Sequence, residues 1–180
     1  VLKRENVSEY LKNLGQNNRK ILRELGVKFG RYHIFLHKLI KPDPVIIRTL
    51  LWKNYHQKYF KLKPPTFGLN FIEDTYNRNQ NFMLLCGFEK FDNFFIRIDI
   101  LERLFMQIIN SGLEENKEIK LVPEMLNLLG CSKDNFKKLI QKMNYKVINK
   151  KEDLFFKYMP PKKFKKSFSK KTIKENPFGI

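Results

Sequence analysis

The stretch FFIRIDILERLFMQIINSGLEENKEIKLVPEMLNLLGCSKDNFKKLIQKMNYKVINKKEDLFFKY, residues 94–158, decides the fold. It predicts a strand, three helices and a hairpin, with a tight turn between the second and third helices. This order is typical of a winged-helix module. Helix-turn-helix geometry also occurs in packing units that bind no nucleic acid, so both interpretations of the stretch stay open.

Start and stop signals bound each expected helix of this stretch. Asp99 is expected to be an N-cap, with Glu102 completing a capping box that satisfies the first amides of the helix. Ser111-Gly112 ends that helix. Pro123 suits the first turn of the second helix, and Gly130 supplies its left-handed stop.

Ser132 is expected to cap the third helix, which has an apolar and a polar side. The apolar residues should face the core: Phe136, Leu139, Ile140 and Met143. The polar residues should face out: Lys133, Asn135, Lys137, Lys138, Gln141 and Lys142. Tyr145–Ile148 and Leu154–Tyr158 then predict a hairpin around a charged tip.

The charge is the most informative feature of the composition. Lys and Arg total 36 against 18 acidic residues, a formal net charge of +18. The chain contains no alanine and is rich in Lys, Asn, Ile and Phe, as AT-rich codons would produce, so part of the excess has that origin. AT-rich codons would not reduce the number of Glu residues, however, and Glu does not balance the lysine excess. An uncompensated charge this large favours a polyanion partner, with nucleic acid ahead of a membrane surface.

Other features bound the class of protein. No apolar run approaches the roughly 20 residues of a membrane span. The first residue is Val1, with no initiator Met and no signal peptide, so we expect a piece of a longer protein. Cys86 and Cys131 have no partner pattern, which indicates buried thiols and a cytoplasmic location.

The N-terminal half predicts a helix over 7–25, a β-rich segment over 27–36 and a helix beginning at Pro44 behind an Asp43 cap. Gly30 indicates a bulge or a close backbone approach. The β-rich segment has no obvious mate nearby, so its expected partner is residues 66–72 or lies outside the chain.

The next segment predicts a helix over 75–86 and then a hairpin pairing 88–91 with 94–98. The order of a helix, Gly87-Phe88 and a hairpin occurs again later in the chain as a helix, Asn144-Tyr145 and a hairpin. One such recurrence is too little to claim a repeat.

The predicted fold class is α+β and mainly helical, with small β-hairpins. We expect a helix-strand-helix accessory segment over 1–62, a linker over 63–74, a winged-helix-like module over 75–159 and a disordered basic tail over 160–180. The tail follows Pro160-Pro161 and is lysine-rich, with Phe164 and Phe168 interleaved. It is either a phosphate-tracking arm with aromatics for base stacking or a solubilising tail.

No catalytic or metal site is predicted. No phosphate-cradling glycine loop is present. His33 and His37 are four residues apart but have no evident third ligand, so we interpret them as structural. The expected capping box accounts for Asp99 and Glu102, which disfavours paired-carboxylate catalysis.

Several segments together resemble a family of helicases. The first is Leu25-Gly26-Val27-Lys28-Phe29-Gly30-Arg31-Tyr32-His33, and the others follow in order: Phe35-Leu36, Leu39-Ile40-Lys41-Pro42, Leu50-Leu51-Trp52, Cys86-Gly87-Phe88, Arg97-Ile98-Asp99-Ile100-Leu101-Glu102-Arg103, Met125-Leu126, Leu129-Gly130-Cys131-Ser132 and Asn176-Pro177-Phe178. They are similar to the region after the motor in bacterial superfamily-two DEAD/DEAH-type helicases, which are similar to the mitochondrial RNA-degradosome helicase.

The resemblance implies an accessory C-terminal region whose motor domains, with their ATP and Mg, lie upstream in a parent chain. His37 stands where the family commonly has proline, alanine is absent and the motor motifs are missing, so helicase activity is not assigned to these 180 residues.

We therefore expect non-catalytic binding of nucleic acid, with single-stranded RNA as the expected ligand, in support of an attached helicase motor. The expected contacts are the third helix, the hairpin tip and the tail: Lys133, Asn135, Lys137, Lys138, Gln141, Lys142, Lys150, Lys151, Lys162, Lys163, Lys165 and Lys166. The rival is an interaction module that packs on the motor or on another protein. It predicts an exposed apolar patch around Phe29, Tyr32 and Phe35.

Overall fold

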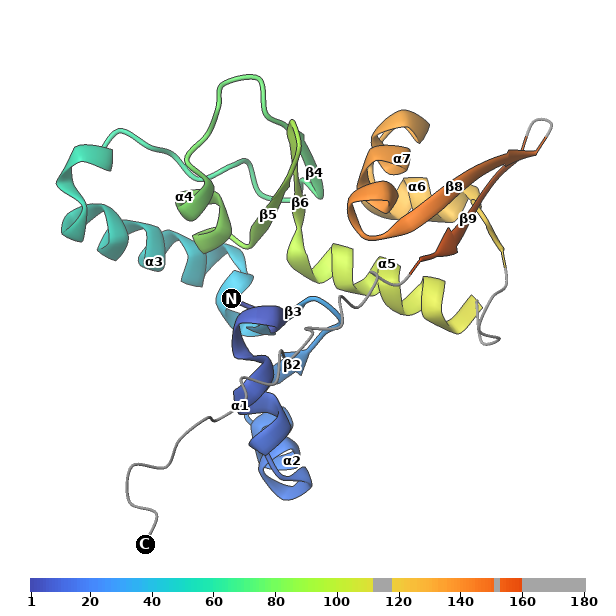
Figure 1. The fold of residues 1–180 in the computed structure, drawn as a ribbon. Coiled ribbons are helices and arrows are strands. Elements are labelled where there is room, and N and C mark those ends of the chain that lie inside the picture. Colours follow the sequence, from blue (N-terminus) through green and yellow to red (C-terminus); the bar gives the residue numbers. More distant parts are fainter. Residues whose placement is uncertain (112–117, 151–152, 160–180) are drawn as a thin grey trace, which may run out of the picture.

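The fold is α+β, with three small antiparallel sheets and about half of the described residues in helices. The computed structural model describes residues 1–111, 118–150 and 153–159. The expected tail, residues 160–180, and the tip residue Lys151 lie outside that part. The elements form three groups in chain order, and each group contains one sheet (Figure 1).

The first group surrounds a sheet of strand order β1-β3-β2. Its elements are β1 (Leu2–Lys3), a 3₁₀ turn (Arg4–Val7), α1 (Ser8–Asn13), α2 (Gln16–Glu24), β2 (Val27–Phe29), β3 (His33–Leu36) and a second 3₁₀ turn (His37–Ile40). The expected single helix over 7–25 is wrong, because the backbone is extended at Leu14 and Gly15, which separates α1 from α2. The expected partner of the β-rich segment is also wrong, since β2 and β3 pair with each other.

The second group surrounds a sheet of order β4-β6-β5. Its elements are α3 (Pro42–Tyr55), a 3₁₀ turn (Gln57–Tyr59), β4 (Phe71–Glu73), α4 (Gln80–Leu85), β5 (Phe88–Phe91) and β6 (Phe94–Arg97). The β5–β6 hairpin confirms the prediction. Three other predictions are corrected. Pro42, not Pro44, is the first residue of α3, strand β4 forms within the expected linker, and α4 is shorter than expected because the Asn79 side chain caps it at Phe82 N.

The third group surrounds a sheet of order β7-β9-β8. Its elements are α5 (Ile98–Ser111), β7 (Ile119–Lys120), α6 (Pro123–Leu129), α7 (Lys133–Lys142), β8 (Tyr145–Lys150) and β9 (Asp153–Tyr158). The predicted signals around α6 and α7 are confirmed. Gly130 has a φ of 70°, and the Ser132 side chain accepts a hydrogen bond from Asn135 N at 3.3 Å.

The three sheets share one topology. In each sheet, the strand that comes first in the chain lies at one edge, the second strand lies at the other edge, and the third strand lies between them. A residue with positive φ precedes each hairpin: Gly26, Gly87 and Asn144. The sequence predicted the second and third hairpins with the residue of positive φ before each, but not the edge strands β4 and β7, and the first group is an additional copy.

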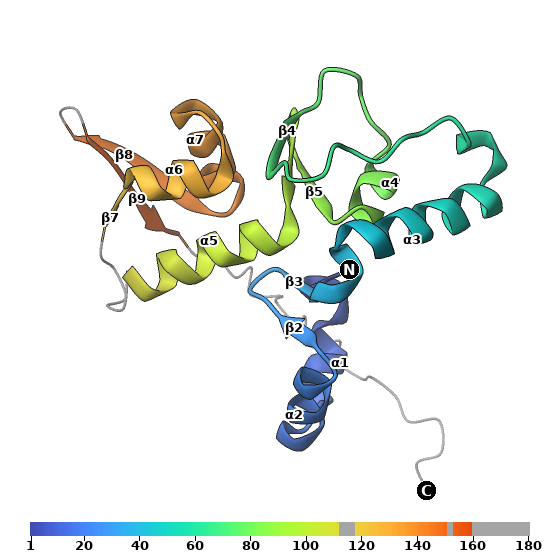
Figure 2. The same ribbon diagram turned by 180° about the vertical axis from the view of Figure 1, so that it is seen from behind.

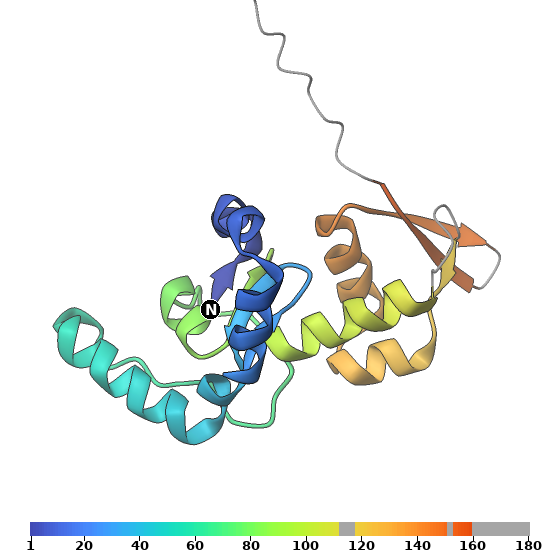
Figure 3. The ribbon, with the colours of Figure 1, turned by 90° about the horizontal axis from the view of Figure 1, so that it is seen from below.

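Helix α5 joins the second group to the third. It runs from the end of β6 beneath α6 and α7, while α3 extends away on the opposite side and α1 and α2 lie below (Figures 1 and 2). The view from below shows α5 passing from the N-terminal strands to the C-terminal hairpin (Figure 3). The larger apolar core lies along α5, and it includes Phe105, Phe136 and Phe156, each fully buried. A smaller core, with Val45 and Phe82, lies between α3, α4 and the second sheet.

Candidate nucleic-acid interface

The polar face of α7 is the surface that the sequence predicts to bind nucleic acid. Phe136, Leu139 and Ile140 are fully buried, and Met143 is 7% exposed, so the predicted inward face is confirmed. The predicted outward residues are exposed or half-buried. Because one side of the helix is apolar and fully packed, its other side must present the polar groups.

The predicted contact residues of α7 and of the hairpin tip differ in their surroundings. Lys138, Gln141 and Lys142 are exposed. Lys137 pairs with Asp134 at 3.2 Å, and Lys150 pairs with Glu118 across the third sheet. The amide of Asn135 contacts Glu73 of β4 at 3.4 Å, which directs it toward the second group. Lys133 is exposed and lies in the first turn of the helix. The predicted residues Lys151, Lys162, Lys163, Lys165 and Lys166 lie outside the described part of the chain.

A cleft of about 500 Å³ begins where α7 ends. One wall comes from the end of α7 and contains Lys142, Met143 and Asn144. The other lining residues come from β1 and the residues after it, from the turn between β2 and β3, and from β5, with Lys3, Arg4, Arg31 and Tyr32 among them. Arg4, Arg31 and Tyr32 were not predicted as nucleic-acid contacts, and Tyr32 was predicted only as part of an apolar patch. The fold therefore brings one predicted contact, Lys142, beside cations from more than 100 positions earlier in the sequence.

The Glu102 carboxylate holds the turn between β2 and β3. It accepts hydrogen bonds from three consecutive backbone N–H groups, those of Arg31, Tyr32 (2.9 Å) and His33 (2.7 Å). The predicted capping box is thus wrong: Glu102 is 6% exposed and points to another element, because its position lies on the buried face of α5. Asp99, expected as the N-cap, is the second residue of α5, where it accepts from Ile100 N and binds Arg97.

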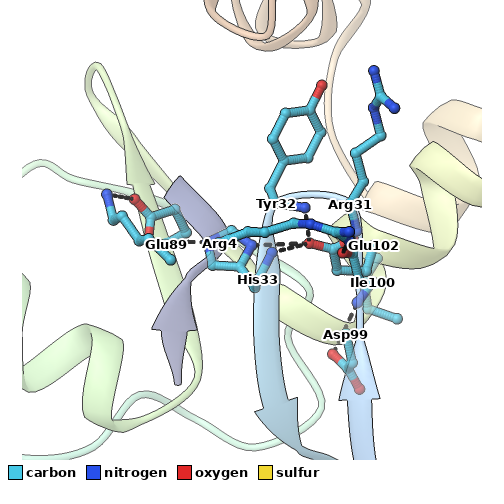
Figure 4. Close-up of polar contacts among 10 residues, drawn as sticks. Arg4, Arg31, Tyr32, His33, Glu89, Asp99, Ile100 and Glu102 are labelled. Atoms are coloured by element: carbon cyan, nitrogen blue, oxygen red, sulfur yellow. Dashed lines mark hydrogen bonds and ion pairs between the residues drawn. The ribbon is translucent and has the colours of Figure 1, made fainter. Parts of the chain in front are cut away.

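The turn is also fixed from its other side. Arg4 N donates to the Tyr32 carbonyl at 2.8 Å, and the Arg4 guanidinium donates to the Gly30 carbonyl at 2.6 Å. Gly30 makes the close approach that the sequence predicted, since a Cβ there would lie 2.4 Å from the Glu102 carboxyl carbon. The side chains of Arg31 and Tyr32 extend together from this turn, away from the Glu102 carboxylate (Figure 4).

His33 lies behind the turn between two carboxylates (Figure 4). Its Nδ1 is 3.1 Å from Glu102, and its Nε2 is 3.4 Å from Glu89, which also binds Lys3 at 2.6 Å. Burial alone would lower the pKa of His33, but the two carboxylates raise it overall. Burial would raise the pKa of Glu89, and His33 and Lys3 lower it. All four carboxylate oxygens are engaged, so the cluster is suited to tying β1, β3, β5 and α5 together.

Arg31, which lines the cleft, lies among tyrosine rings. Its guanidinium carbon is 5.9 Å from the centre of the Tyr32 ring and 5.4 Å from that of Tyr158. Burial alone would lower the pKa of Arg31, but the surrounding Tyr32, Tyr145 and Tyr158 raise it. The Tyr32 hydroxyl is buried, and no described residue completes a hydrogen bond of good geometry with it, although Arg31 is close enough to interact electrostatically.

The described residues offer little else for chemistry. Burial raises the pKa of the Cys86 thiol to about 12 and that of the Cys131 thiol to about 11, so both stay protonated and are poor nucleophiles. Within residues 1–111, 118–150 and 153–159, no three His, Cys, Asp or Glu side chains form a group that could hold a metal ion. His37 is 4.0 Å from Asp99 and does not join His33.

The predicted apolar patch around Phe29, Tyr32 and Phe35 is absent from the described surface. Phe35 is buried, and Tyr32 packs on the Phe105 ring with 4.7 Å between the ring centres. Exposed apolar residues gather instead on α3: Ile46, Ile47, Leu50, Leu51 and Tyr55, which are 48–84% exposed.

No known protein family, curated protein or solved structure matches this chain. Among the described helices, none has the length and apolar character needed to cross a membrane.

Proposed function

We propose that this chain binds single-stranded RNA, without sequence specificity and without catalysis, as the accessory region of an ATP-dependent helicase. The observation that carries the binding proposal is the outward face of α7, where Lys133, Lys138 and Lys142 are exposed on a helix whose other face is fully packed. Lysine ammonium groups held on a rigid helix bind phosphates with little dependence on base sequence.

The topology around α7 supports this use of the helix. The order α5, β7, α6, α7, β8, β9 and the sheet order β7-β9-β8 are consistent with a winged-helix-like module in which α7 is the second helix of the helix-turn-helix. In such modules this helix contacts nucleic acid and the hairpin flanks it. The helicase part of the proposal rests on the sequence resemblance, with ATP and Mg belonging to the upstream motor.

The test of the proposal removes lysines from α7 and leaves the cleft intact. Replacing Lys137 and Lys138 by Glu changes the charge by four units at positions that pack no core. We expect the variant to bind a single-stranded RNA of about ten nucleotides at least about tenfold more weakly than the wild type. A matched variant, Lys20→Glu with Lys61→Glu, makes the same charge change on other elements.

The matched variant separates the effect of a local contact at α7 from the effect of the net charge of the protein. If both variants lose affinity equally, net charge alone governs binding, and α7 is not the contact surface. If the α7 variant binds as the wild type does while its circular dichroism spectrum and unfolding midpoint are unchanged, the proposal is wrong.

A second candidate function, a protein-interaction module, is favoured by one observation. The apolar residues Ile47, Leu50 and Leu51 of α3 are each about 60% exposed on one helix. Adjacent exposed apolar side chains of this size are typical of a protein contact surface. This use of α3 is compatible with RNA binding, because α3 extends from the opposite side of the molecule from α7 (Figure 1).

A further inference from the structure

We infer that the cleft between the β2–β3 turn and the end of α7 is a nucleotide-binding site, which holds one phosphate and one stacked base of a single strand. The inference rests on the proposed function and adds to it a defined pocket, made by groups that are distant in sequence. Only Lys142 belongs both to this cleft and to the α7 face.

The size of the cleft suits one nucleotide. At about 500 Å³ it falls within the range of about 300–1,000 Å³ that is usual for small-ligand sites. Its lining comes from four parts of the fold: β1 with the 3₁₀ turn and the start of α1 after it, the β2–β3 turn with His33, strand β5, and the end of α7 with Asn144. A strand lying along α7 would reach this cleft at Lys142, since the residue is exposed and lines it.

The charges in the cleft favour an anion. Four cationic side chains line it, Lys3, Arg4, Arg31 and Lys142, against the carboxylates of Glu5 and Glu89. Glu89 is already bound by Lys3 and His33. Arg31 and Lys142 line the cleft from the β2–β3 turn and from the end of α7, and neither forms an ion pair with a carboxylate of the described residues. A phosphate bound in the cleft would give an anionic partner to these two cations, which have none within the described part of the chain.

The groups beside these cations favour a base over an acidic side chain. Arg31 lies next to the rings of Tyr32 and Tyr158, and Phe91 also lines the cleft. Aromatic rings and guanidinium planes are the surfaces on which unpaired bases stack. An acidic peptide would use the cations but would leave this aromatic surface unused.

The turn is preorganised for such a role. Three hydrogen bonds to Glu102 and two from Arg4 fix its backbone before any ligand arrives. The backbone that carries Arg31 and Tyr32 therefore needs no further ordering when a ligand binds.

The experiment measures binding of a fluorescent oligouridylate of about ten nucleotides to three proteins at about 0.1 M salt. They are the wild type, the cleft variant Arg31→Gln with Lys142→Gln, and the matched variant Lys20→Gln with Lys61→Gln. Each phosphate contact on a single strand contributes a salt exponent of about 0.7, or about fivefold in affinity at 0.1 M. We expect the cleft variant to bind about 25-fold more weakly and the matched variant to bind within about twofold of the wild type.

A second measurement locates the nucleotide directly. Uridine 5′-monophosphate added to ¹⁵N-labelled wild type should shift the amide signals of Arg31, Tyr32, Lys142 and Asn144. Shifts spread over α2 and α3 instead would overturn the inference, whether or not the cleft variant folds.

The outcomes separate this inference from the proposed function. If the wild type binds the oligomer with strong salt dependence but the cleft variant binds equally well, the α7 proposal stands and the nucleotide site is refuted. If the wild type does not bind the oligomer, both fail. If polyglutamate of equal charge displaces the oligomer at equal concentration, the cleft selects acidic chains, and the nucleotide assignment is wrong.

Discussion

Replacing Glu102 by Leu should destabilise the protein far more than the loss of a helix cap would. The substitution removes the acceptor for three backbone N–H groups and for His33 Nδ1 while keeping a side chain of similar size. Each buried donor left without a partner costs about 1–3 kcal/mol. Arg31 is an exposed residue, and we therefore count only the amides of Tyr32 and His33 in full. The expected loss in the free energy of unfolding is about 4 kcal/mol.

Urea unfolding followed by circular dichroism measures this loss. Glu102→Gln is the control, because it keeps one carbonyl oxygen for the turn amides, and it should lose about half as much. A loss of about 1 kcal/mol for Glu102→Leu is what removal of a surface capping box would give. That result would refute the assignment of Glu102 as the acceptor that holds the turn.

Three other predictions concern stability. His33 stabilises the fold while it is protonated, because its carboxylate neighbours raise its folded pKa above the ordinary 6.5. Its contribution to the free energy of unfolding is complete below pH 6.5 and is lost as the pH rises through the folded pKa. The stability difference between wild type and His33→Gln, from urea unfolding, should therefore shrink as the pH rises above about 6.5, and a constant difference would contradict the charged pairing. Gly30→Ala places a Cβ 2.4 Å from Glu102 and should cost about 1–3 kcal/mol in the same assay, whereas Gly15→Ala meets no atom within 4 Å and should cost under about 1 kcal/mol. Ile47→Lys with Leu51→Lys should change the free energy of unfolding by less than about 1 kcal/mol, because both side chains are mostly exposed; a large loss would show that α3 is buried in solution.

The parts of the fold that were predicted from sequence depend on local signals. Phe136, Leu139 and Ile140 stand at helical spacing, so the two faces of α7 follow from periodicity alone. Gly130 ends α6 and Ser132 begins α7, and both are recognisable in the sequence. The β5–β6 hairpin is likewise local, since Asp92-Asn93 marks its turn and Asp92 adopts a φ of 48°.

The parts that were missed depend on contacts between distant residues. The β2–β3 turn has no Asn-Gly or Asp-Gly signal, and Glu102, about 70 positions away, supplies the acceptor that stabilises it. The cleft has the same origin, because Arg4, Arg31 and Lys142 are separate in sequence. One signal was available: Glu102 stands among Leu101, Phe105 and Ile108 on the buried side of α5, where a carboxylate must find a buried partner.

The salt dependence of RNA binding tests the central claim most directly. We predict that the wild type binds single-stranded RNA. The logarithm of its affinity should fall linearly with the logarithm of salt concentration, with a slope of about −2 or steeper, equivalent to three or more phosphate contacts. An affinity that stays flat from about 0.05 to 0.5 M salt, or no binding at the lowest salt, would contradict it.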